Sequence, residues 1–264
     1  RWTRDEKTGT VYRQNFTQNF LGERSPFFGG NPIPGLLRTN YTNDATFEEV
    51  TPRVSLTWEA SDALTLYTSY SQGFKSGGFD MRGDAVFTPT TVNGYEPETI
   101  DSFEVGFKGA FLDRTLFTNV ALFKSKYKNQ QVTVQVPSLA GGIASFVDNA
   151  GRGDIWGAEL ELRAVPSPNF SMNAAVGYTN ADYKEFLTFI TGGTTPVDVA
   201  NAREFQNTPR FTASASATAS GDLLGGTISF TPAVSLRSDA YMFEIPTPAL
   251  DPDGYFLVDA SAAW

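Results

Sequence analysis

Hydrophobic and polar residues alternate along much of this chain, most clearly over residues 149–178. An apolar residue stands at every second position over 158–164 and again over 170–178. A Pro-Ser-Pro-Asn sequence at 166–169 separates the two runs, and it favours a turn because proline fixes φ and cannot donate to a strand ladder. Since strand side chains point alternately to two faces, the stretch predicts a β-hairpin with one apolar face and one polar, partly charged face.

The same alternation recurs on both sides of this hairpin, and helical periodicity is hard to find. Together with a strand end at 1–5, it predicts further strands at 47–59, 63–75, 98–110, 115–134, 204–219, 226–238 and 255–264. The chain is therefore expected to be all-β and antiparallel, with about ten strands. Many of them are roughly 12–18 residues long, whereas soluble strands average about 5–6 and a membrane crossing needs about 9–11.

The connections between these strands alternate in length. Short turns are expected at 60–62, 111–114, 166–169 and 220–224, and long connections at 6–46, 76–96, 137–146, 185–203 and 239–253. Short turns at one end and long loops at the other are typical of a transmembrane β-barrel. Aromatic residues expected beside the short turns, where an interfacial girdle would lie, are Trp58, Phe111, Phe117 and Phe170. The alternative is a water-soluble β-sandwich, which would have shorter strands and loops balanced between both ends.

Composition narrows the function classes. The chain has 264 residues, with 29 acidic and 20 basic side chains and neither His nor Cys. Its acidic balance argues against nucleic acid as a partner. Without His or Cys it can build neither a Ser-His-Asp or Cys-His nucleophile nor an ordinary zinc site. The sequence contains no run of about 18 apolar residues, so it predicts no transmembrane helix. We therefore predict no catalytic residue, no resident metal and no cofactor.

Several stretches resemble the barrel of TonB-dependent outer-membrane receptors, and their order and spacing over roughly 47–264 make the resemblance specific. These stretches are YTSYSQGFKSGGFD at 67–80, YEPETIDSFEVGFK at 95–108, FTNVALFKSKYKNQQV at 117–132, NAGRGDIWGAELEL at 149–162 and YFLVDASAAW at 255–264. The resemblance implies an antiparallel transmembrane barrel of about 22 strands in the outer membrane of a Gram-negative bacterium. It also implies a plug domain in the lumen, which would match inward carboxylates such as Glu98, Glu104, Glu159 and Glu161.

The chain departs from the family pattern in its extent. Residues 1–264 are interpreted as a partial receptor barrel domain, from its middle to late portion. The plug domain, the short segment that engages TonB and the final strands are expected to lie outside this sequence. Contact with the TonB complex is accordingly expected through that missing N-terminal part.

The resemblance implies active import of a scarce ligand, usually a ferric siderophore and sometimes cobalamin, haem or a glycan, energised through TonB. Aromatic rings and cationic groups in the long connections would suit an anionic ferric complex. The candidate ligand-binding residues are Phe74, Lys75, Phe79, Arg82, Tyr95, Arg152 and Arg203. Phe27 and Phe28 in the first long connection add aromatic surface. The alternative role for each candidate is structural: it would contact the plug, lipopolysaccharide or neighbouring loops instead of the ligand.

Other functions remain open at this stage. A passive porin or adhesin-type barrel would lack a plug and have an open lumen. An outer-membrane enzyme is disfavoured because the familiar His-based hydrolytic machinery is absent. Haem as the ligand is disfavoured because no His in this sequence can serve as an axial ligand. Outer-membrane lipid and lipopolysaccharide are expected partners of any such barrel.

Overall fold

A computed structural model describes residues 1–14, 37–83, 88–137, 143–188 and 195–264. Most of them belong to strands, so the all-β, antiparallel prediction is confirmed. The strands are β1 (Trp2–Gln14), β2 (Leu37–Val50), β3 (Arg53–Ser61), β4 (Leu64–Lys75), β5 (Glu98–Phe111), β6 (Leu116–Pro137), β7 (Ile143–Ser167), β8 (Phe170–Thr188), β9 (Val197–Asp198), β10 (Phe211–Leu223), β11 (Gly226–Arg237) and β12 (Tyr255–Ala263). Two short 3-10 helices are η1 (Pro89–Asn93) and η2 (Ala200–Ala202). Within the described ranges, no helix is both long and apolar enough to cross a membrane.

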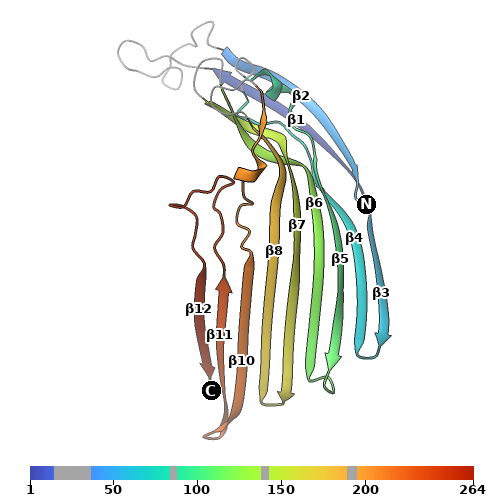
Figure 1. Cartoon of the computed structure of the whole chain (residues 1–264), viewed down its shortest axis with the longest axis vertical. Coiled ribbons are helices and arrows are strands. Elements are labelled where there is room, and N and C mark those ends of the chain that lie inside the picture. The colour runs from blue at the N-terminus through green and yellow to red at the C-terminus, as the bar shows by residue number, and fades with distance from the viewer. Residues whose placement is uncertain (15–36, 84–87, 138–142, 189–194) are drawn as a thin grey trace.

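The main sheet runs in the order β12-β11-β10-β8-β7-β6-β5-β4-β3, and β9 adds to β8. Each neighbour along this path is antiparallel and is also adjacent in the chain, apart from the small β9. Short turns join the strands at one end, called the turn end here, and the long connections gather at the other, the loop end (Figure 1). Strands β1 and β2 form a separate two-stranded ladder at the loop end (Figure 1).

The strand registers bring the apolar positions of all nine strands onto one face. Val54 lies opposite Tyr70, which lies opposite Phe103, and the same correspondence continues across the sheet. This surface is hereafter the apolar face. Its side chains are exposed in the isolated chain: Leu56, for example, is 68% exposed. The alternation predicted from the sequence therefore holds over the whole sheet, since a one-residue slip at any ladder would have moved a strand's apolar residues to the other side.

Two rows of aromatic side chains bound the apolar face. The turn-end row comprises Trp58, Phe111, Phe170 and Trp264, and the loop-end row comprises Tyr70, Phe103, Trp156, Tyr178, Phe211 and Phe256. In the loop-end row, the Trp156 and Tyr178 ring centroids are 5.4 Å apart. Between the two rows, the described positions of this face carry no charged side chain.

The opposite face, hereafter the polar face, carries the intervening residues. Glu104, Glu159 and Glu161 all lie on it, as predicted. Asn119 donates from Nδ2 to Glu161 Oε2 over 3.2 Å. Phe117 also lies on the polar face, with the Arg163 guanidinium 6.0 Å from its ring centroid. The prediction that Phe117 belongs to the aromatic girdle is therefore wrong. The neighbouring residue Leu116 lies on the apolar face instead.

Short turns follow β3, β5, β7 and β10, as predicted, but the strand expected at 204–219 is β10 at Phe211–Leu223, so the turn expected at 220–224 is confined to 224–225. The turn after β5 uses positive φ at Leu112, Asp113 and Arg114, and the turn after β10 uses positive φ at Leu224 and Gly225. Two consecutive residues with positive φ match the right-handed twist of flanking strands, which is why such tight hairpins favour Gly at one position. These turns therefore fix the register of the hairpins they close.

The long connections are more ordered than predicted. Much of the expected irregular stretch 6–46 is strand, because β1 and β2 pair from Trp2↔Val50 to Gln14↔Leu37. The alternation there is mostly among polar residues, so hydrophobicity did not reveal it. The expected single strand 47–59 divides at Pro52, whose ring nitrogen has no hydrogen to donate. Phe27 and Phe28 lie outside the described residues.

Candidate functional site

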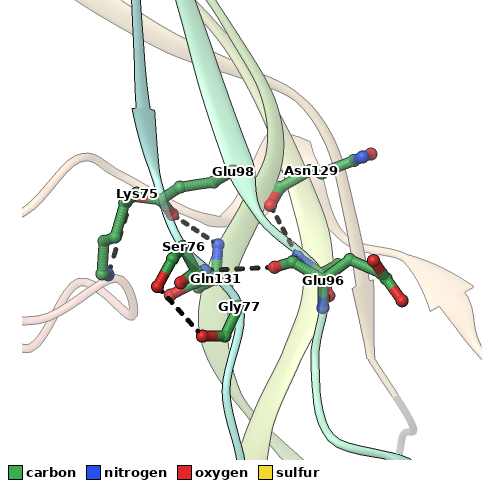
Figure 2. A network of polar contacts seen from close by, with 8 residues as sticks. Lys75, Ser76, Gly77, Glu96, Glu98, Asn129 and Gln131 are labelled. Carbon is green, nitrogen blue, oxygen red and sulfur yellow. Dashed lines mark hydrogen bonds and ion pairs between the residues drawn. The ribbon is translucent and has the colours of Figure 1, made fainter. Parts of the chain in front are cut away.

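The connection between β4 and β5 is fastened to the extended part of β6 by a glutamine. Gln131 donates from its backbone amide to Glu98 Oε2 over 2.7 Å. Its side-chain Nε2 donates to the carbonyls of Ser76 and Glu96, at 2.9 and 3.1 Å. Figure 2 shows this side chain between the two ends of the connection. One amide group therefore closes both ends of the 76–96 loop against the sheet.

An asparagine on β7 completes the same network. Asn149 accepts a hydrogen bond from the Glu96 amide at its Oδ1, over 2.6 Å. Its Nδ2 donates to the carbonyls of Glu96 and Asn129, at 2.8 and 2.9 Å. Asn129 has a φ of +50° where the β6–β7 register shifts, a conformation that Asn tolerates better than most residues. The irregularity in the β6–β7 ladder thus turns the Asn129 carbonyl toward Asn149, the residue that holds Glu96.

A buried carboxylate holds the middle of the loop. Asp80 accepts from Arg82 Nη2 at 2.7 Å and from the Val147 amide of β7 at 2.6 Å. The Arg82 amide adds a bond of 2.8 Å to the other oxygen. Burial alone raises the pKa of the Asp80 carboxyl, but these hydrogen bonds outweigh it, so its pKa lies below the ordinary value. Asp80 is therefore an ionised structural centre, and it raises the pKa of Arg82 in turn.

The β1–β2 ladder covers the other side of the loop. Phe79 packs so closely on Gly9 that a Cβ there would lie 2.5 Å from the ring. A Cβ on Gly77 would lie 2.6 Å from the Phe47 ring. Asn43 of β2 donates from Nδ2 to the Val92 carbonyl over 2.6 Å. The loop is thus held between the β1–β2 ladder and the β6–β7 extension; we call this assembly the polar anchor.

A second connection, after β8, is held by aromatic packing. The Tyr183 ring stacks on Phe205 with centroids 4.2 Å apart and meets Phe186 edge-on at 5.1 Å. Arg203 lies over the Phe186 ring, 5.4 Å from its centroid. Burial, with Glu244 nearby, raises the pKa of Tyr183 to about 12, so its hydroxyl stays protonated. This group, hereafter the aromatic anchor, belongs to the buried hydrophobic cluster of the described residues.

One carboxylate also supports the aromatic anchor. Asp198 Oδ1 accepts from the amides of Phe186 and Ala200, both at 3.0 Å. These two hydrogen bonds lower the pKa of Asp198. The anchors meet at adjacent residues of β7, because Phe146 packs in the hydrophobic cluster while the amide of Val147 binds Asp80.

The structure brings four of the predicted ligand-binding residues together in the polar anchor. Lys75 ends β4 on the polar face, with Nζ 3.6 Å from Glu98 Oε1, and remains 64% exposed. Phe79 and Arg82 make the contacts described above. Tyr95 pairs with Gly78 through two backbone hydrogen bonds of 2.8 and 3.0 Å. Their roles in ligand binding stay predictions, and their contacts within the chain show that they also shape the loop.

The other three predicted residues lie elsewhere. Arg203 belongs to the aromatic anchor. Phe74 pairs with Thr99. Strand alternation puts it on the apolar face, four residues beyond Tyr70 toward the loop end. Arg152 stands on the same face as Trp156 and pairs with Glu185, Nη2 to Oε2, over 3.2 Å. Ligand binding by Phe74 and Arg152 therefore stays a prediction made from sequence position, and it would require access from the apolar face.

Sequence reasoning missed the residues that fasten the loops: Asp80, Gln131, Asn149 and Asp198. Each acts through hydrogen bonds to backbone amides or carbonyls, and although Asp80, Gln131 and Asn149 lie in stretches that carry the family resemblance, the resemblance assigned them no role. The only available signal was an uncharged or acidic polar residue beside a long connection, which is common in any loop. Polar residues with this role are recognisable only once the strands are paired.

The polar face is hollowed below these anchors. One concavity of about 780 Å³ is lined by charged groups that include Lys108, Glu161, Arg163 and Asp259. A second, of about 440 Å³, adjoins Tyr67, Glu104 and Glu159. The curved sheet therefore presents a polar, charged inner surface below a rim of fastened loops.

A sheet of long antiparallel strands, with a charge-free face between aromatic rows and a charged inner face, is a segment of a large transmembrane-type β-barrel. A family model described as TonB dependent receptor-like, beta-barrel, matches residues 8–264. The chain belongs to this family of TonB-dependent receptors. It is a family of outer-membrane transport receptors rather than of enzymes.

Individual relatives and solved structures are consistent with this family assignment. The probable TonB-dependent siderophore receptor PiuA of Acinetobacter baumannii is 25% identical over 173 residues, which cover 64% of this chain and 22% of that protein. The ferric yersiniabactin uptake receptor FyuA of Yersinia pestis matches in structure with a TM-score of 0.64 at 18% identity, over 88% of this chain and 32% of that one. The copper transporter OprC also has a TM-score of 0.64, at 13% identity, over 99% of this chain and 36% of that one. The last two likenesses concern the fold alone.

The chain spans about a fifth of the PiuA protein and about a third of the matched structures. The names of structures with this fold differ in cargo, since one is named for ferric yersiniabactin and another for copper. The cargo must therefore be argued separately from the fold.

Proposed function

We propose that this chain is part of the barrel of an outer-membrane receptor that imports a scarce small ligand, most simply a ferric siderophore, with energy supplied through TonB. The observation that carries the proposal is the family match over residues 8–264, together with a curated relative that is named a siderophore receptor. The charge-free apolar face supports the membrane setting, because a contiguous exposed apolar surface of this extent is unfavourable in water.

The loop end supplies the ligand-facing surface in this proposal. Lys75 and Arg82 place two cationic groups in the polar anchor, which also holds Phe79 and Tyr95, and Arg203 lies over the Phe186 ring of the aromatic anchor. Cations and ring faces together favour an anionic, ring-bearing ferric complex such as a ferric catecholate. The Arg82 side chain is half exposed while it holds Asp80, so its positive charge remains accessible from the rim.

The charged inner surface suits a partner inside the barrel. Glu104, Glu159 and Glu161 face the concave side without enough neighbouring cations to neutralise them, since Lys108 and Arg163 are the nearest basic groups on those strands. A plug domain with basic side chains facing this wall would compensate them. The same surface in a passive porin would line an open aqueous channel.

Uptake by cells that carry the full-length receptor tests the proposal. Cells that lack other iron receptors would be given ⁵⁵Fe bound to a tris-catecholate or to a trihydroxamate, with and without a protonophore, and in a strain without TonB. We expect accumulation of one ferric complex that stops when either the proton gradient or TonB is removed. Uptake that persists in both conditions would identify a passive barrel, and no uptake of either complex would remove the siderophore assignment.

A paired substitution tests the rim. Replacing Lys75 and Arg82 by Gln should raise the Kd for the imported complex about a hundredfold or more, since two lost charge-assisted hydrogen bonds together contribute about 3–6 kcal/mol. The matched control is Arg114→Gln at the turn end, which removes a charge far from the rim and should leave the Kd unchanged.

A further inference from the structure

The hydroxyl group of Tyr41 on β2 is enclosed without a hydrogen-bond partner. Its oxygen is shielded from solvent, and within the described residues it makes no hydrogen bond. A phenol hydroxyl can both donate and accept, and leaving one unpaired away from water is unfavourable. An isolated group of this kind in a folded protein therefore requires an explanation.

Strand alternation places the Tyr41 side chain inside the polar anchor. Tyr41 stands on β2 between Thr39 and Asn43, and residues two apart on a strand share a face. Thr39 donates from Oγ1 to the Gly83 carbonyl over 3.4 Å. Asn43 donates from Nδ2 to the Val92 carbonyl over 2.6 Å. The Tyr41 side chain therefore points into the β4–β5 connection, between two points at which β2 already holds it.

Asp80 is the ionised group that acts on this hydroxyl. Gly83, the residue that Thr39 contacts, closes a turn by donating from its amide to the Asp80 carbonyl over 3.0 Å. Burial, and then the charge of Asp80, raise the pKa of Tyr41, so its hydroxyl stays protonated and can donate. The polar anchor therefore holds a proton donor close to the Asp80 carboxylate but not bonded to it.

Other donors already bind both oxygens of the Asp80 carboxylate. The Arg82 guanidinium donates from Nε to Oδ1 over 3.0 Å and from Nη2 to Oδ2 over 2.7 Å, and the amides of Arg82 and Val147 add one bond each. Among these donors, the guanidinium alone can leave without movement of the main chain, since the Arg82 side chain is half exposed. Its departure would leave a buried carboxylate short of donors, which is unfavourable unless another donor takes its place.

We propose that Tyr41 is the exchange partner of Arg82: when the guanidinium turns to an anionic oxygen at the rim, the Tyr41 hydroxyl donates to Asp80 in its place. This inference rests on the proposed function, in which Arg82 meets an anionic ligand. No covalent bond changes, and Tyr41 keeps its proton. The exchange lets one arginine serve both the loop and the ligand, because Asp80 stays paired after the guanidinium has left. Tyr41 is a positioning residue, since it acts on the ligand through Asp80 and Arg82.

A double-mutant cycle without ligand tests the exchange itself. Hydrogen exchange of residues 76–83 would be measured in the full-length receptor for the parent, Tyr41→Phe, Arg82→Met and the double variant. In the parent, Tyr41→Phe removes a hydroxyl that bonds nothing, so we expect no rise in the opening constant of this segment. In Arg82→Met, which cannot donate, the same substitution should raise it about tenfold or more, because a hydrogen bond to a charged group is lost. Equal effects of Tyr41→Phe in both backgrounds would overturn the proposal.

Ligand binding supplies a second arm, with a ferric tris-catecholate as the probe. Its Kd would be measured on the purified full-length receptor for the parent, for Tyr41→Phe and for the control Tyr255→Phe, which removes an exposed hydroxyl on β12, across the sheet from β3. We expect Tyr41→Phe to raise the Kd about tenfold and the control to leave it unchanged. A Kd of Tyr41→Phe within about twofold of the parent value would overturn the proposal. If the parent binds no ferric complex, the proposed function fails, whereas the exchange at Asp80 stands or falls on the ligand-free cycle.

Discussion

The polar anchor and the aromatic anchor fasten two neighbouring connections at the same end of the sheet by different physical means. The first relies on hydrogen bonds from Asp80, Gln131 and Asn149 to main-chain groups, and the second on stacked rings around Tyr183. Polar fastening is directional and depends on ionisation, whereas aromatic packing depends mainly on buried area and shape. The comparison teaches that the order of one loop can depend mainly on ionised groups, while that of its neighbour depends mainly on packing, with Asp198 as a supporting carboxylate.

The largest expected effect comes from removing a ring of the aromatic anchor. Phe186 is only 3% exposed, so Phe186→Ala should lower the free energy of opening of the 195–206 segment by about 3–4 kcal/mol. Hydrogen exchange of the amides of this segment in the full-length receptor measures the change. The control is Leu187→Ala, the next residue and 37% exposed, which should cost less than about 1 kcal/mol. Equal effects of both variants would contradict the packing explanation.

Removing the carboxylate of the polar anchor should have a somewhat smaller effect. Asp80→Asn loses the charge that binds Arg82 and the Val147 amide, and should lower the free energy of opening of residues 76–83 by about 2–3 kcal/mol. The expected loss is no larger because the Arg82 side chain is half exposed, so water can replace its contact with Asp80. Asp253→Asn, at an exposed position, serves as the control. Unchanged exchange in residues 76–83 would show that Asp80 does not fasten the loop.

Acid should distinguish the anchors with the smallest, graded effect. The pKa of Asp80 is depressed in the folded chain, so its stabilisation is complete above the ordinary carboxyl pKa of about 3.9 and is lost as the pH falls through the folded value. Exchange of residues 76–83 should therefore accelerate below about pH 4, after correction for its intrinsic pH dependence. Asp80→Asn should abolish this acceleration. Stacking of Tyr183 on Phe205 should persist through the same range, although the exposed Asp198 weakens its own two hydrogen bonds there.

The sheet could be predicted from the sequence because one physical rule governs it. Each strand must place its apolar residues on a single side, and the short turns leave little freedom in register. This rule located the hairpin at 149–178 and the inward carboxylates Glu159 and Glu161 correctly. It misplaced Phe117, because an aromatic residue beside a turn was assigned by proximity and not by its position in the alternation.

The loop end could not be predicted in the same way. The bond from the Val147 amide to Asp80 joins residues 67 apart, and that from the Glu96 amide to Asn149 joins residues 53 apart. Such contacts depend on where the strands end in space, which hydrophobic alternation does not specify. The extension of β1 and β2 was missed for a related reason: a ladder with few apolar residues has strand geometry without a hydrophobic signal.

Adjacent positions of β7 serve both connections, since Phe146 belongs to the buried cluster that contains Phe186 and the amide of Val147 binds Asp80. Their free energies are consequently not additive, because a displacement of this stretch that frees one connection also shifts a contact of the other. Thermodynamic linkage then runs in both directions. Under the proposed function, a ligand that binds one connection and favours its closed form should therefore also raise the population of the closed form of the other.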